Sequence, residues 1–559
     1  MHRRPWLAHY PESVPHEIDL SRYASLGALF EDSFQRFRER SAFVFMGKSM
    51  SYGELDEASR TMAAYFQSLG LRPGDRVAVM MPNVMQYPVC VAAVLRAGLV
   101  LVNVNPLYTP RELRHQLNDS GAKALVIIEN FARTFQEVRR EVGVEHVVLA
   151  TMGDSLGLLK GLLVNTVVRH VKKLVPAFDL PGAVPWPQAL AQGRQARFTA
   201  PEISPDAIAA LQYTGGTTGV SKGAVLSHRN LIANTLQCLA WMAPAANTVP
   251  AGQQVTLACA LPLYHIFAFT ANMMFALALG GRNLLIPNPR DLPALFKTLR
   301  ANPVHIFPAV NTLFQGMLNH PDFATVDWSQ LKISLGGGMA VQSKTAKDWL
   351  ARTGCAICEG YGLSETSPVV SANLVNSREF TGTIGLPLPG TDVAILDDAG
   401  QPVPDGQPGE ISVRGPQVMQ GYWQRPDETA KVMTPDGYFR TGDIGVLQES
   451  GRVKIVDRKK DMILVSGFNV YPNEIEDVMT QMPGVLECAC VGVPDEHTGE
   501  AVKIVVVLRD PAVTEAQIRT FCSENLTGYK RPRHIEFRTE LPKTPVGKIL
   551  RRELRDKTA

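Results

Sequence analysis

The sequence predicts an α/β protein, in which a large N-terminal α/β domain of several subdomains is followed by a small α+β C-terminal domain. Helix and strand signals alternate over residues 1–130, whereas short alternating elements follow residue 456. The chain has 559 residues, of which 45% are hydrophobic and 19% are charged. These values are typical of compact globular proteins and exclude a disordered, collagen-like or coiled-coil chain.

Local signals define the elements of the first part of the chain. Two capping-box patterns predict helix starts, and short Val-rich apolar runs after each helix predict strands. The boxes are Ser51 with Glu54 and Thr109 with Glu112, and the runs span residues 76–81 and 123–128. Such alternation indicates a mostly parallel sheet covered by helices, in which ligands usually bind beyond the carboxyl ends of the strands.

Two longer apolar stretches could suggest contact with a membrane. Residues 266–279 are too short to span a bilayer, which needs about 20 residues, so we expect a buried helix there. Residues 156–175 place leucines and valines at helical spacing beside basic residues, namely Lys160, Arg169, Lys172 and Lys173. This second segment is either an ordinary surface helix with a solvated basic face or a helix that rests on an anionic membrane surface.

Charge and cysteine usage limit the partners and the compartment. Lys and Arg total 56 against 53 Asp and Glu, a net charge of +3, which is too balanced to predict a nucleic-acid partner. The eight cysteines are scattered, and the pair Cys355 and Cys358 has no second pair to complete a zinc or redox site. The basic start of the chain lacks the apolar core of a signal peptide. We therefore expect buried, reduced thiols in a cytoplasmic protein.

The C-terminal part predicts a separate small domain. The charged segment 457–461 is the best candidate linker, which divides the chain into residues 1–456, the linker and residues 462–559. Beyond the linker we expect helices from about residues 473 and 514 and strands at 488–493, 503–508 and 534–537.

The segment 213–223 carries the strongest chemical signal. Glycines, hydroxyl side chains and Lys222 follow a strand-like run at 208–211, a combination that predicts a phosphate-binding loop. Lys222 stands between Ser221 and Gly223, so the loop is not a Walker A motif. Two alternatives stay open here. The segment Gly219 to Gly223 also fits the G-x-S-x-G elbow of a serine hydrolase, and the run can be read as a flexible loop of Gly, Ser and Thr.

Together with this loop, six further motifs resemble the adenylate-forming acyl-CoA synthetases over nearly the whole chain, and most closely the bacterial long-chain fatty-acyl-CoA synthetases. The segment 436–460 also resembles the signature of fatty-acid members. The six motifs are Leu261 to His265, Gly336 to Gly338, Glu359 to Thr366, Thr441 to Asp443, Asp457 to Asp461, and Pro542 to Lys548. The resemblance implies a two-step reaction, in which a carboxylate and ATP give acyl-AMP and pyrophosphate, and CoA then displaces AMP. It also implies a C-terminal domain that rotates between the two steps.

The resemblance assigns a role to each matched residue. Lys548, Glu365 and Lys222 are the implied catalytic residues, and Glu365 is the implied ligand of Mg²⁺. Lys460 is the implied hinge, and Tyr264, His265 and Gly467 are implied to line the acyl and CoA channels. The implied ATP and AMP contacts are Tyr213, Thr214, Gly215, Gly216, Thr217, Thr218, Gly219, Ser221, Lys222, Gly223, Gly336, Gly337, Gly338, Glu359, Tyr361, Gly362, Ser364, Thr366, Asp443 and Arg458.

The predicted function is therefore an ATP-, Mg²⁺- and CoA-dependent ligase for long-chain fatty acids. A ligase for medium-chain or aromatic acids is the first alternative, although Leu464 stands where some relatives such as luciferases carry a lysine. A serine hydrolase and a non-catalytic nucleotide- or lipid-binding scaffold are alternatives from other classes. Phe267, Phe269, Met273 and Met274 either line an acyl tunnel or pack in the core. Peripheral contact with the membrane and a homodimer both stay open.

Overall fold

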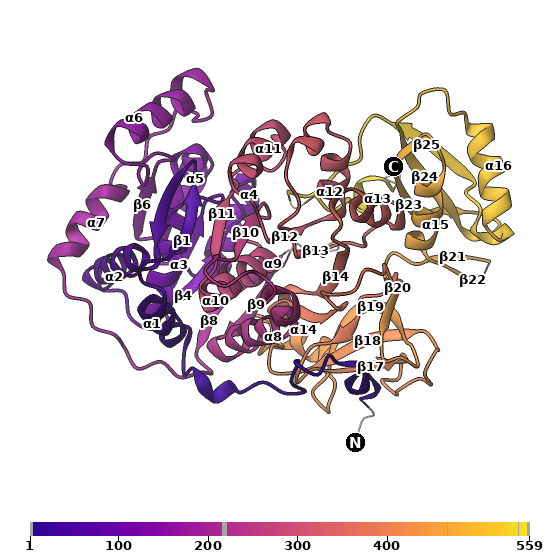
Figure 1. Cartoon of the computed structure of the whole chain (residues 1–559), viewed down its shortest axis with the longest axis horizontal. Helices are drawn as coiled ribbons and strands as arrows, with labels where there is room; N and C mark the ends of the chain where they lie inside the picture. Colours follow the sequence, from indigo (N-terminus) through magenta and orange to yellow (C-terminus); the bar gives the residue numbers. More distant parts are fainter. Residues whose placement is uncertain (1–3, 215–220, 467, 546, 556–559) are drawn as a thin grey trace.

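The structure is a computed structural model, and it describes residues 4–214, 221–466, 468–545 and 547–555. These described residues form four sheets (Figure 1). Two large sheets build the N-terminal part, and two small sheets follow them along the chain. The predicted α/β class with an α+β C-terminal unit is confirmed.

The first large sheet has seven strands in the order β7-β6-β5-β3-β4-β8-β9, and all its pairs are parallel except β8 with β9. Helices α2 (Tyr52–Ser68) and α4 (Pro110–Ser120) begin at the two predicted capping boxes, and both boxes are formed. The strands are β3 (Arg76–Met80), β4 (Val100–Asn103), β5 (Ala124–Ile128), β6 (His146–Ala150), β7 (Val184–Pro185), β8 (Ile208–Thr214) and β9 (Lys222–Ser227).

The second large sheet has nine strands and supplies much of the cavity wall. Its order is β16-β15-β14-β13-β12-β10-β11-β1-β2, with a parallel centre and antiparallel edges. The strands are β1 (Ser41–Phe45), β2 (Lys48–Ser51), β10 (Thr256–Cys259), β11 (Arg282–Leu285), β12 (Ile306–Ala309), β13 (Ile333–Gly336), β14 (Ile357–Gly362), β15 (Val369–Ala372) and β16 (Leu386–Pro387).

Apolar faces of helices join the two large sheets into one core. The largest buried cluster contains side chains from both sheets and from α1 (Leu26–Arg36), α2, α3 (Gln86–Arg96) and α8 (His228–Ala246). The segment 266–279 is helical and largely buried, as predicted, and comprises α9 (Ile266–Ala268), η6 (Phe269–Met274) and α10 (Phe275–Leu279). Among the described residues, the structure contains no helix long and apolar enough to cross a membrane.

A four-stranded antiparallel sheet, which the sequence patterns did not predict, follows the large sheets. It consists of β17 (Asp392–Leu396), β18 (Gly409–Arg414), β19 (Phe439–Leu447) and β20 (Val453–Arg458). A turn at 459–461 then leads into the C-terminal unit. The predicted linker 457–461 thus coincides with the end of β20 and this turn. We keep the boundaries at 456 and 462 as a proposal.

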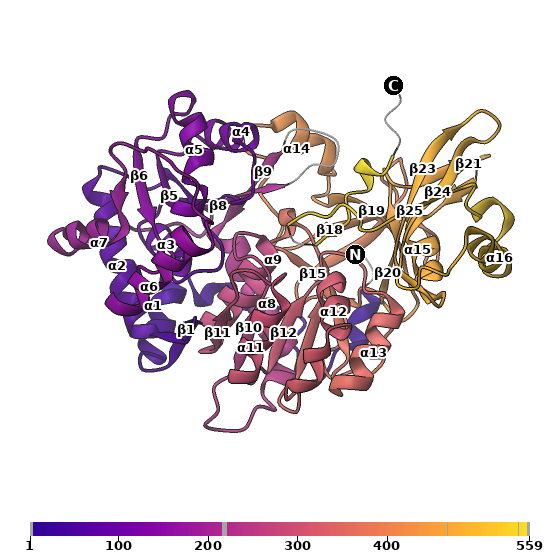
Figure 2. The same ribbon diagram turned by 90° about the horizontal axis from the view of Figure 1, so that it is seen from above.

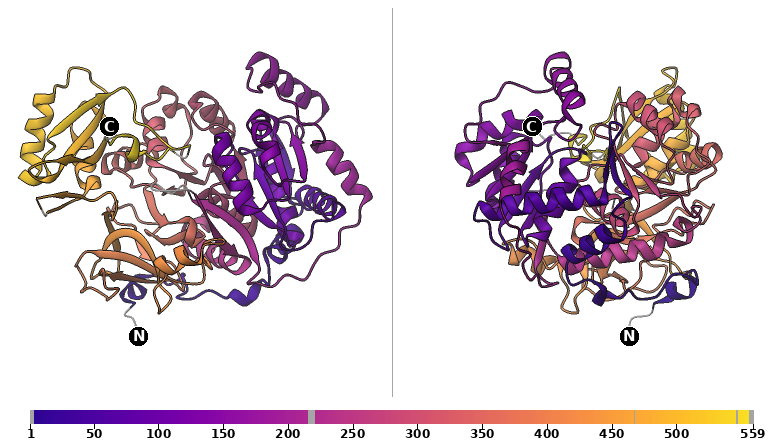
Figure 3. Two further views of the ribbon diagram at one scale, coloured as in Figure 1. Left: turned by 180° about the vertical axis from the view of Figure 1, so that it is seen from behind. Right: turned by 60° about the vertical axis from the view of Figure 1, so that its left-hand side comes forward.

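The C-terminal unit contains each element predicted for it, with longer strands than expected. Strand β24 pairs with β23 on one side and with β21 and β25 on the other. The elements are β21 (Ile463–Val465), β22 (Phe468–Val470), α15 (Pro472–Gln481), β23 (Val485–Asp495), β24 (Gly499–Leu508), α16 (Glu515–Asn525) and β25 (His534–Arg538). This unit lies at the opposite end of the molecule from the seven-stranded sheet (Figures 2 and 3).

The C-terminal unit contacts the N-terminal part around α12 (Asn311–Leu318). Gln315 Nε2 donates a hydrogen bond of 2.7 Å to the carbonyl of Leu486, and Thr312 Oγ1 donates one of 3.3 Å to the carbonyl of Gly547. These contacts hold the segment that carries Lys548 against the mouth of the cavity described next.

Candidate active site

One large cavity lies where the two large sheets, the four-stranded sheet and the C-terminal unit meet. Its volume is about 2110 Å³. Drug-sized ligands usually occupy clefts of about 300–1,000 Å³, so this cavity can hold more than one substrate. Its walls combine polar side chains near the C-terminal unit with apolar side chains from α8 and the nine-stranded sheet.

The two ends of the predicted phosphate loop lie at this cavity. Thr214 ends β8 and Lys222 begins β9, and the two residues are partners in the antiparallel pair. Lys222 forms an ion pair with Glu428 of α14 (Pro426–Val432) and lies 5.2 Å from the ring centre of Tyr422. Residues 215–220, including Gly215, Gly216, Thr217, Thr218 and Gly219, lie outside the described residues.

Asp119 of α4 joins the strand that leads into this loop to the segment 423–425. Its Oδ2 accepts a hydrogen bond of 2.7 Å from the Tyr213 hydroxyl, and its Oδ1 pairs with Arg425 at 2.6 Å. The indole of Trp423 donates to the Asp119 carbonyl at 3.0 Å.

Ser221 comes directly before strand β9. A nucleophile elbow leads from a strand into a helix, so the serine-hydrolase interpretation does not fit this geometry.

Asp443, Tyr361 and Arg458 form a second polar group on the cavity wall. Asp443 is buried on β19, and its Oδ2 accepts a 2.6 Å hydrogen bond from the Tyr361 hydroxyl. Its Oδ1 lies 3.2 Å from Arg458 Nε, on the adjacent strand β20. Each carboxylate oxygen has a second lone pair, so the group can still accept from hydroxyls of a ligand.

Glu365 follows β14 in a short 3-10 turn and is buried. Its Oε1 accepts a 2.8 Å hydrogen bond from the Tyr422 hydroxyl. Burial raises the pKa of the carboxyl group, because the charged form loses its hydration. A buried carboxylate near a phosphate-binding loop fits a bound Mg²⁺ ion, which typically takes one or two protein carboxylates and completes its shell with phosphate oxygens and water.

Lys548 enters the cavity from a tight turn in the C-terminal unit. The backbone N–H of Lys548 donates to Thr544 Oγ1 at 3.1 Å, and the Thr544 N–H donates to the Lys548 carbonyl at 2.7 Å. Gly547 in this turn has a φ of 83°, and an added Cβ would lie 2.6 Å from Thr312 Oγ1, so no other residue type fits without strain.

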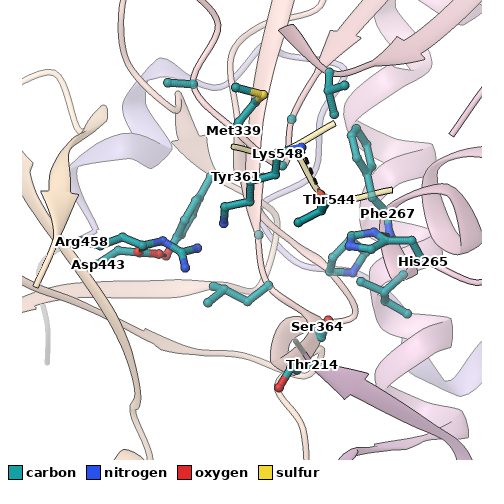
Figure 4. A pocket seen from close by; sticks show the side chains of 18 of the residues that line it. Thr214, His265, Phe267, Met339, Tyr361, Ser364, Asp443, Arg458, Thr544 and Lys548 are labelled. Carbon is teal, nitrogen blue, oxygen red and sulfur yellow. Dashed lines mark hydrogen bonds and ion pairs between the residues drawn. The ribbon is translucent and has the colours of Figure 1, made fainter. Parts of the chain in front are cut away.

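The Lys548 side chain points toward Tyr361 and the Asp443–Arg458 pair, with His265 and Phe267 on the other side of the cavity (Figure 4). Thr214 and Ser364 lie together below them (Figure 4). Desolvation in the cavity, followed by repulsion from Arg458, lowers the pKa of Lys548 from 10.5 to about 7. A bound anion would remove part of this penalty, because it favours the charged ammonium.

His265 lies opposite Lys548 and is neutral at pH 7. Desolvation and repulsion from Lys548 lower its pKa to about 4. Its Nδ1 accepts a 3.3 Å hydrogen bond from the N–H of Phe267 and so caps the helical segment that starts at Ile266. This contact fixes the imidazole as part of the wall, beside the buried Tyr264.

Glu359 of β14 is a further buried carboxyl group in the wall. Its Oε1 accepts a 2.9 Å hydrogen bond from the N–H of Val341. Burial raises the pKa of Glu359 to about 7.

An apolar group of side chains continues the cavity into the core. These side chains belong to one buried cluster and also line the cavity. Three come from α8, and Trp241 among them is fixed by a 3.0 Å hydrogen bond from its indole N–H to the carbonyl of Asn373. The group comprises Cys238, Trp241, Met242, Phe267, Ala271, Leu335, Ala372 and Leu388.

The structure brings most of the predicted site residues to this one cavity. Those that line it are Tyr213, Thr214, Ser221, Lys222, Tyr264, His265, Gly337, Gly338, Glu359, Tyr361, Gly362, Ser364, Glu365, Asp443, Arg458, Lys460 and Lys548. Gly467, like the loop residues 215–219, lies outside the described residues.

Three predicted nucleotide contacts do not line the cavity. Thr366 is fully buried and donates its hydroxyl to the carbonyl of Pro368. An added Cβ at Gly336 would lie 2.6 Å from Val341, and one at Gly223 would lie 3.2 Å from the Tyr213 ring. These residues therefore support the wall from behind, where a larger side chain would displace it.

The four candidates for the acyl tunnel also divide into residues that line the cavity and residues that do not. Phe267 lines the cavity, whereas Phe269, Met273 and Met274 pack in the main core.

The motif-based prediction missed Tyr422, Glu428 and Asp119, and it also missed Trp241. Neither spacing nor motif marks these residues, because they meet the site only through long-range packing.

Comparisons with known proteins agree with this geometry. Residues 30–423 match the family model of the AMP-binding enzyme, and residues 474–548 match that of the AMP-binding enzyme C-terminal domain. The chain therefore belongs to the AMP-binding enzyme family, the adenylate-forming superfamily that its motifs resemble.

Curated relatives match over almost the full length. A long-chain-fatty-acid–CoA ligase of Escherichia coli O6:H1 is 54% identical over 99% of this chain and 98% of its own. The enzyme of the same name from Bacillus subtilis is 38% identical over 99% of this chain and 98% of its own. A feruloyl-CoA synthase of an Amycolatopsis species is 34% identical over 91% of this chain and 94% of its own.

Solved structures share the fold. ATP-bound MatB of Rhodopseudomonas palustris is 29% identical and superposes with a TM-score of 0.77, covering 94% of this chain and 98% of its own. The anthranilate CoA ligase AuaEII with anthranoyl-AMP has a TM-score of 0.83 at 24% identity, over 96% of this chain and 98% of its own, and shows the fold alone.

Proposed function

We propose that this protein is an ATP-dependent long-chain fatty acid–CoA ligase that works through an acyl-AMP intermediate. One observation carries the proposal: a single cavity joins the ends of a phosphate loop, the Asp443 group, Lys548 and a deep apolar group. The names of the relatives above support the same substrate class. The chain uses ATP and CoA as co-substrates in this proposal.

In the first step, an oxygen of the fatty carboxylate attacks the α-phosphorus of ATP, and the bond to the β-phosphate breaks. Lys548 would contact the oxygens on which negative charge concentrates, while Lys222 and the hydroxyls of the 213–223 loop would hold the leaving pyrophosphate. Asp443 would accept the ribose hydroxyls, and Tyr361 would offer its ring face to adenine.

Mg²⁺ would be held by Glu365 and would neutralise charge on the phosphates when bound. The Tyr422 hydroxyl orients this carboxylate, and burial keeps competing water away from it. Lys222 would exchange its ion pair with Glu428 for the phosphate oxygens as the nucleotide enters.

In the second step, the CoA thiol gives up its proton to water as its sulfur attacks the acyl carbonyl carbon, and AMP leaves with the electrons of the C–O bond. We propose that the C-terminal unit rotates about the turn at Lys460 between the steps, which withdraws Lys548 and opens a path for the thiol. Tyr264 and His265 would line this path. His265 is neutral, so it can pack against the uncharged pantetheine arm without the cost of burying a charge.

The acyl chain would lie along the apolar group around Trp241. Its lining gives a long alkyl chain continuous apolar contact, at about 0.8 kcal/mol for each buried methylene. We also propose a cytoplasmic location, because all eight cysteines are free and buried, which suits a reducing compartment.

The test is pyrophosphate release from the purified protein with ATP and Mg²⁺, across fatty acids of increasing chain length and several aromatic acids, with and without CoA. We expect a long-chain optimum, and acyl-CoA only when CoA is added. An optimum for medium-chain or aromatic acids would keep the mechanism and replace the substrate. Absence of pyrophosphate release with every acid tested, from a folded protein, would refute the ligase assignment.

A further inference from the structure

A helix at the far end of the molecule exposes an unusually apolar surface. Helix α6 (Leu158–Thr166) continues directly into the π-helical turn η5 (Val167–Val171) and projects from the edge of the N-terminal part (Figure 1). Its large apolar side chains are among the most exposed in the chain. The α6 face consists of Leu158, Leu159, Leu162, Leu163, Val171 and Leu174, with exposed fractions of 89%, 84%, 68%, 64%, 71% and 53%.

Several contacts anchor the side of the helix opposite the α6 face, so the exposure of this face is a property of the fold. Gly161 packs directly on the backbone of Gly153, and an added Cβ on Gly161 would lie 2.5 Å from the Gly153 carbonyl oxygen. Asn165 accepts a 2.8 Å hydrogen bond from the Gly153 N–H. Arg169 pairs at 2.6 Å with Glu129, which is buried. The helix therefore presents its leucines outward because its opposite side is anchored.

The segment that carries the α6 face has basic side chains and no acidic ones. Residues 155–178 contain Lys160, Arg169, Lys172 and Lys173 but neither Asp nor Glu. Lys172 and Lys173 are exposed at the end of η5, next to Val171. Lys160 bends back and donates to the carbonyl of Met46, whose own side chain is 47% exposed beside the helix.

We propose that the α6 face is a membrane-docking surface, which inserts its leucines into the interfacial region of an anionic lipid bilayer and places its lysines at the phosphate level. Amphipathic helices with an apolar face and basic flanks bind membranes in this way, and their affinity follows buried apolar area and lipid charge. The helix lies on the bilayer, because 14 residues in α6 and η5 are too few to span it.

A second copy of this chain fits the surface less well. A two-fold contact would bury the same patch of both copies, and would therefore gather both sets of Lys172 and Lys173 at one interface to which residues 155–178 contribute no acidic partner. Like charges across an interface disfavour association. An anionic bilayer offers an apolar layer that buries the leucines and negative headgroups that attract the lysines.

The proposal concerns a surface far from the cavity, so it can be tested independently of the ligase activity. The full-length protein is sedimented with vesicles of phosphatidylcholine alone or of phosphatidylcholine with phosphatidylglycerol. We expect binding to the anionic vesicles that weakens with salt. Absence of binding to them, or equal binding to neutral vesicles, would overturn the proposal.

Two variants separate the apolar and the basic contributions. Leu159→Glu with Leu163→Glu should weaken binding at least about tenfold, because it places two charges in the apolar layer. Lys172→Gln with Lys173→Gln should weaken it about 30-fold, since each basic residue near an anionic surface contributes about fivefold. Phe537→Glu, which replaces a 43% exposed side chain on β25 at the opposite end, is the matched control and should bind as the wild type does.

A direct probe guards against effects on folding. Leu162→Cys, labelled with an environment-sensitive dye, should shift to shorter-wavelength emission with anionic vesicles, and the eight native cysteines are buried and shielded from the label. Pyrophosphate release with a short soluble fatty acid should be unchanged in every variant. Unaltered vesicle binding in the leucine variant would contradict the proposal. A dimer in solution that this variant dissociates would also contradict it and would assign the face to a second copy.

Discussion

Lys548 offers the sharpest test of the proposed site. The hydrogen bonds between Thr544 and Lys548 hold the backbone so that the ammonium enters the cavity, toward Tyr361 and the Asp443–Arg458 pair. If it contacts the charge that develops during adenylation, Lys548→Ala should lower that step by about 100- to 1,000-fold, the usual cost of losing one preorganised donor. Formation of acyl-CoA from supplied acyl-AMP should be spared, because the lysine has left the site by then.

The pH profile tests the same residue in the wild-type protein. The pKa of Lys548 is lowered from 10.5 to about 7, so the charged form dominates below pH 7 and is lost above it. The kcat/KM of pyrophosphate release reports the free enzyme, and it should fall about tenfold for each pH unit above about pH 7. Bound ATP favours the ammonium, so the corresponding limb of kcat should lie at higher pH.

Lys548→Arg serves as the control, because a guanidinium stays charged and should lose the alkaline limb even if its activity is reduced. Both half-reactions are followed in parallel, by pyrophosphate release and by thioester formation from acyl-AMP. An equal loss of the two steps in Lys548→Ala would refute the assigned role. So would a kcat/KM that stays flat from pH 6 to pH 9 in the wild type.

Three further predictions follow from the cavity and the hinge. Asp443→Asn weakens an acceptor shared by Tyr361 and Arg458 and should raise the KM for ATP by roughly 10- to 100-fold, whereas an effect on the KM of the fatty acid alone would contradict its place at the ribose. Trp241→Ala enlarges the apolar end and should move the chain-length optimum of pyrophosphate release upward, at a cost of about 3–5 kcal/mol in the free energy of unfolding; an unchanged optimum would place the acyl chain elsewhere. Lys460→Pro fixes φ within the turn at 459–461 and should block one half-reaction while sparing the other, so full activity in both would count against the hinge.

Much of the fold was readable from local sequence. The boxes at Ser51 and Thr109 start helices where predicted, since a cap is a contact between residues three apart. The strand at residues 124–128 and the elements of the C-terminal unit were recognisable because their apolar patterns also depend on residues close together in the sequence. The antiparallel sheet β17–β20 was missed, although residues 410–414 alternate polar and apolar side chains as a half-buried strand does.

Motifs predicted many of the site residues, and tertiary packing decided which of them face the cavity. Motifs identified Lys222, Glu365 and Lys548, and the structure places all three at one cavity. Motifs also pointed to Thr366, which packs behind the wall, whereas Met273, which the sequence left open between tunnel and core, belongs to the core. A motif records which residues occur together in a family, but it does not record which side of a wall each side chain faces.

The sequence by itself determined the family, the order of the elements and the chemistry of the side chains, because these depend on residue type and on short-range spacing. Only the tertiary structure decided what surrounds each group. Arg425 reaches Asp119 across 306 positions, and Tyr422 meets Glu365 across 57. The lowered pKa of Lys548 likewise arises from burial beside Arg458, 90 positions earlier in the chain. Burial and electrostatic potential are sums over neighbours in space, so they exist only once the chain has folded.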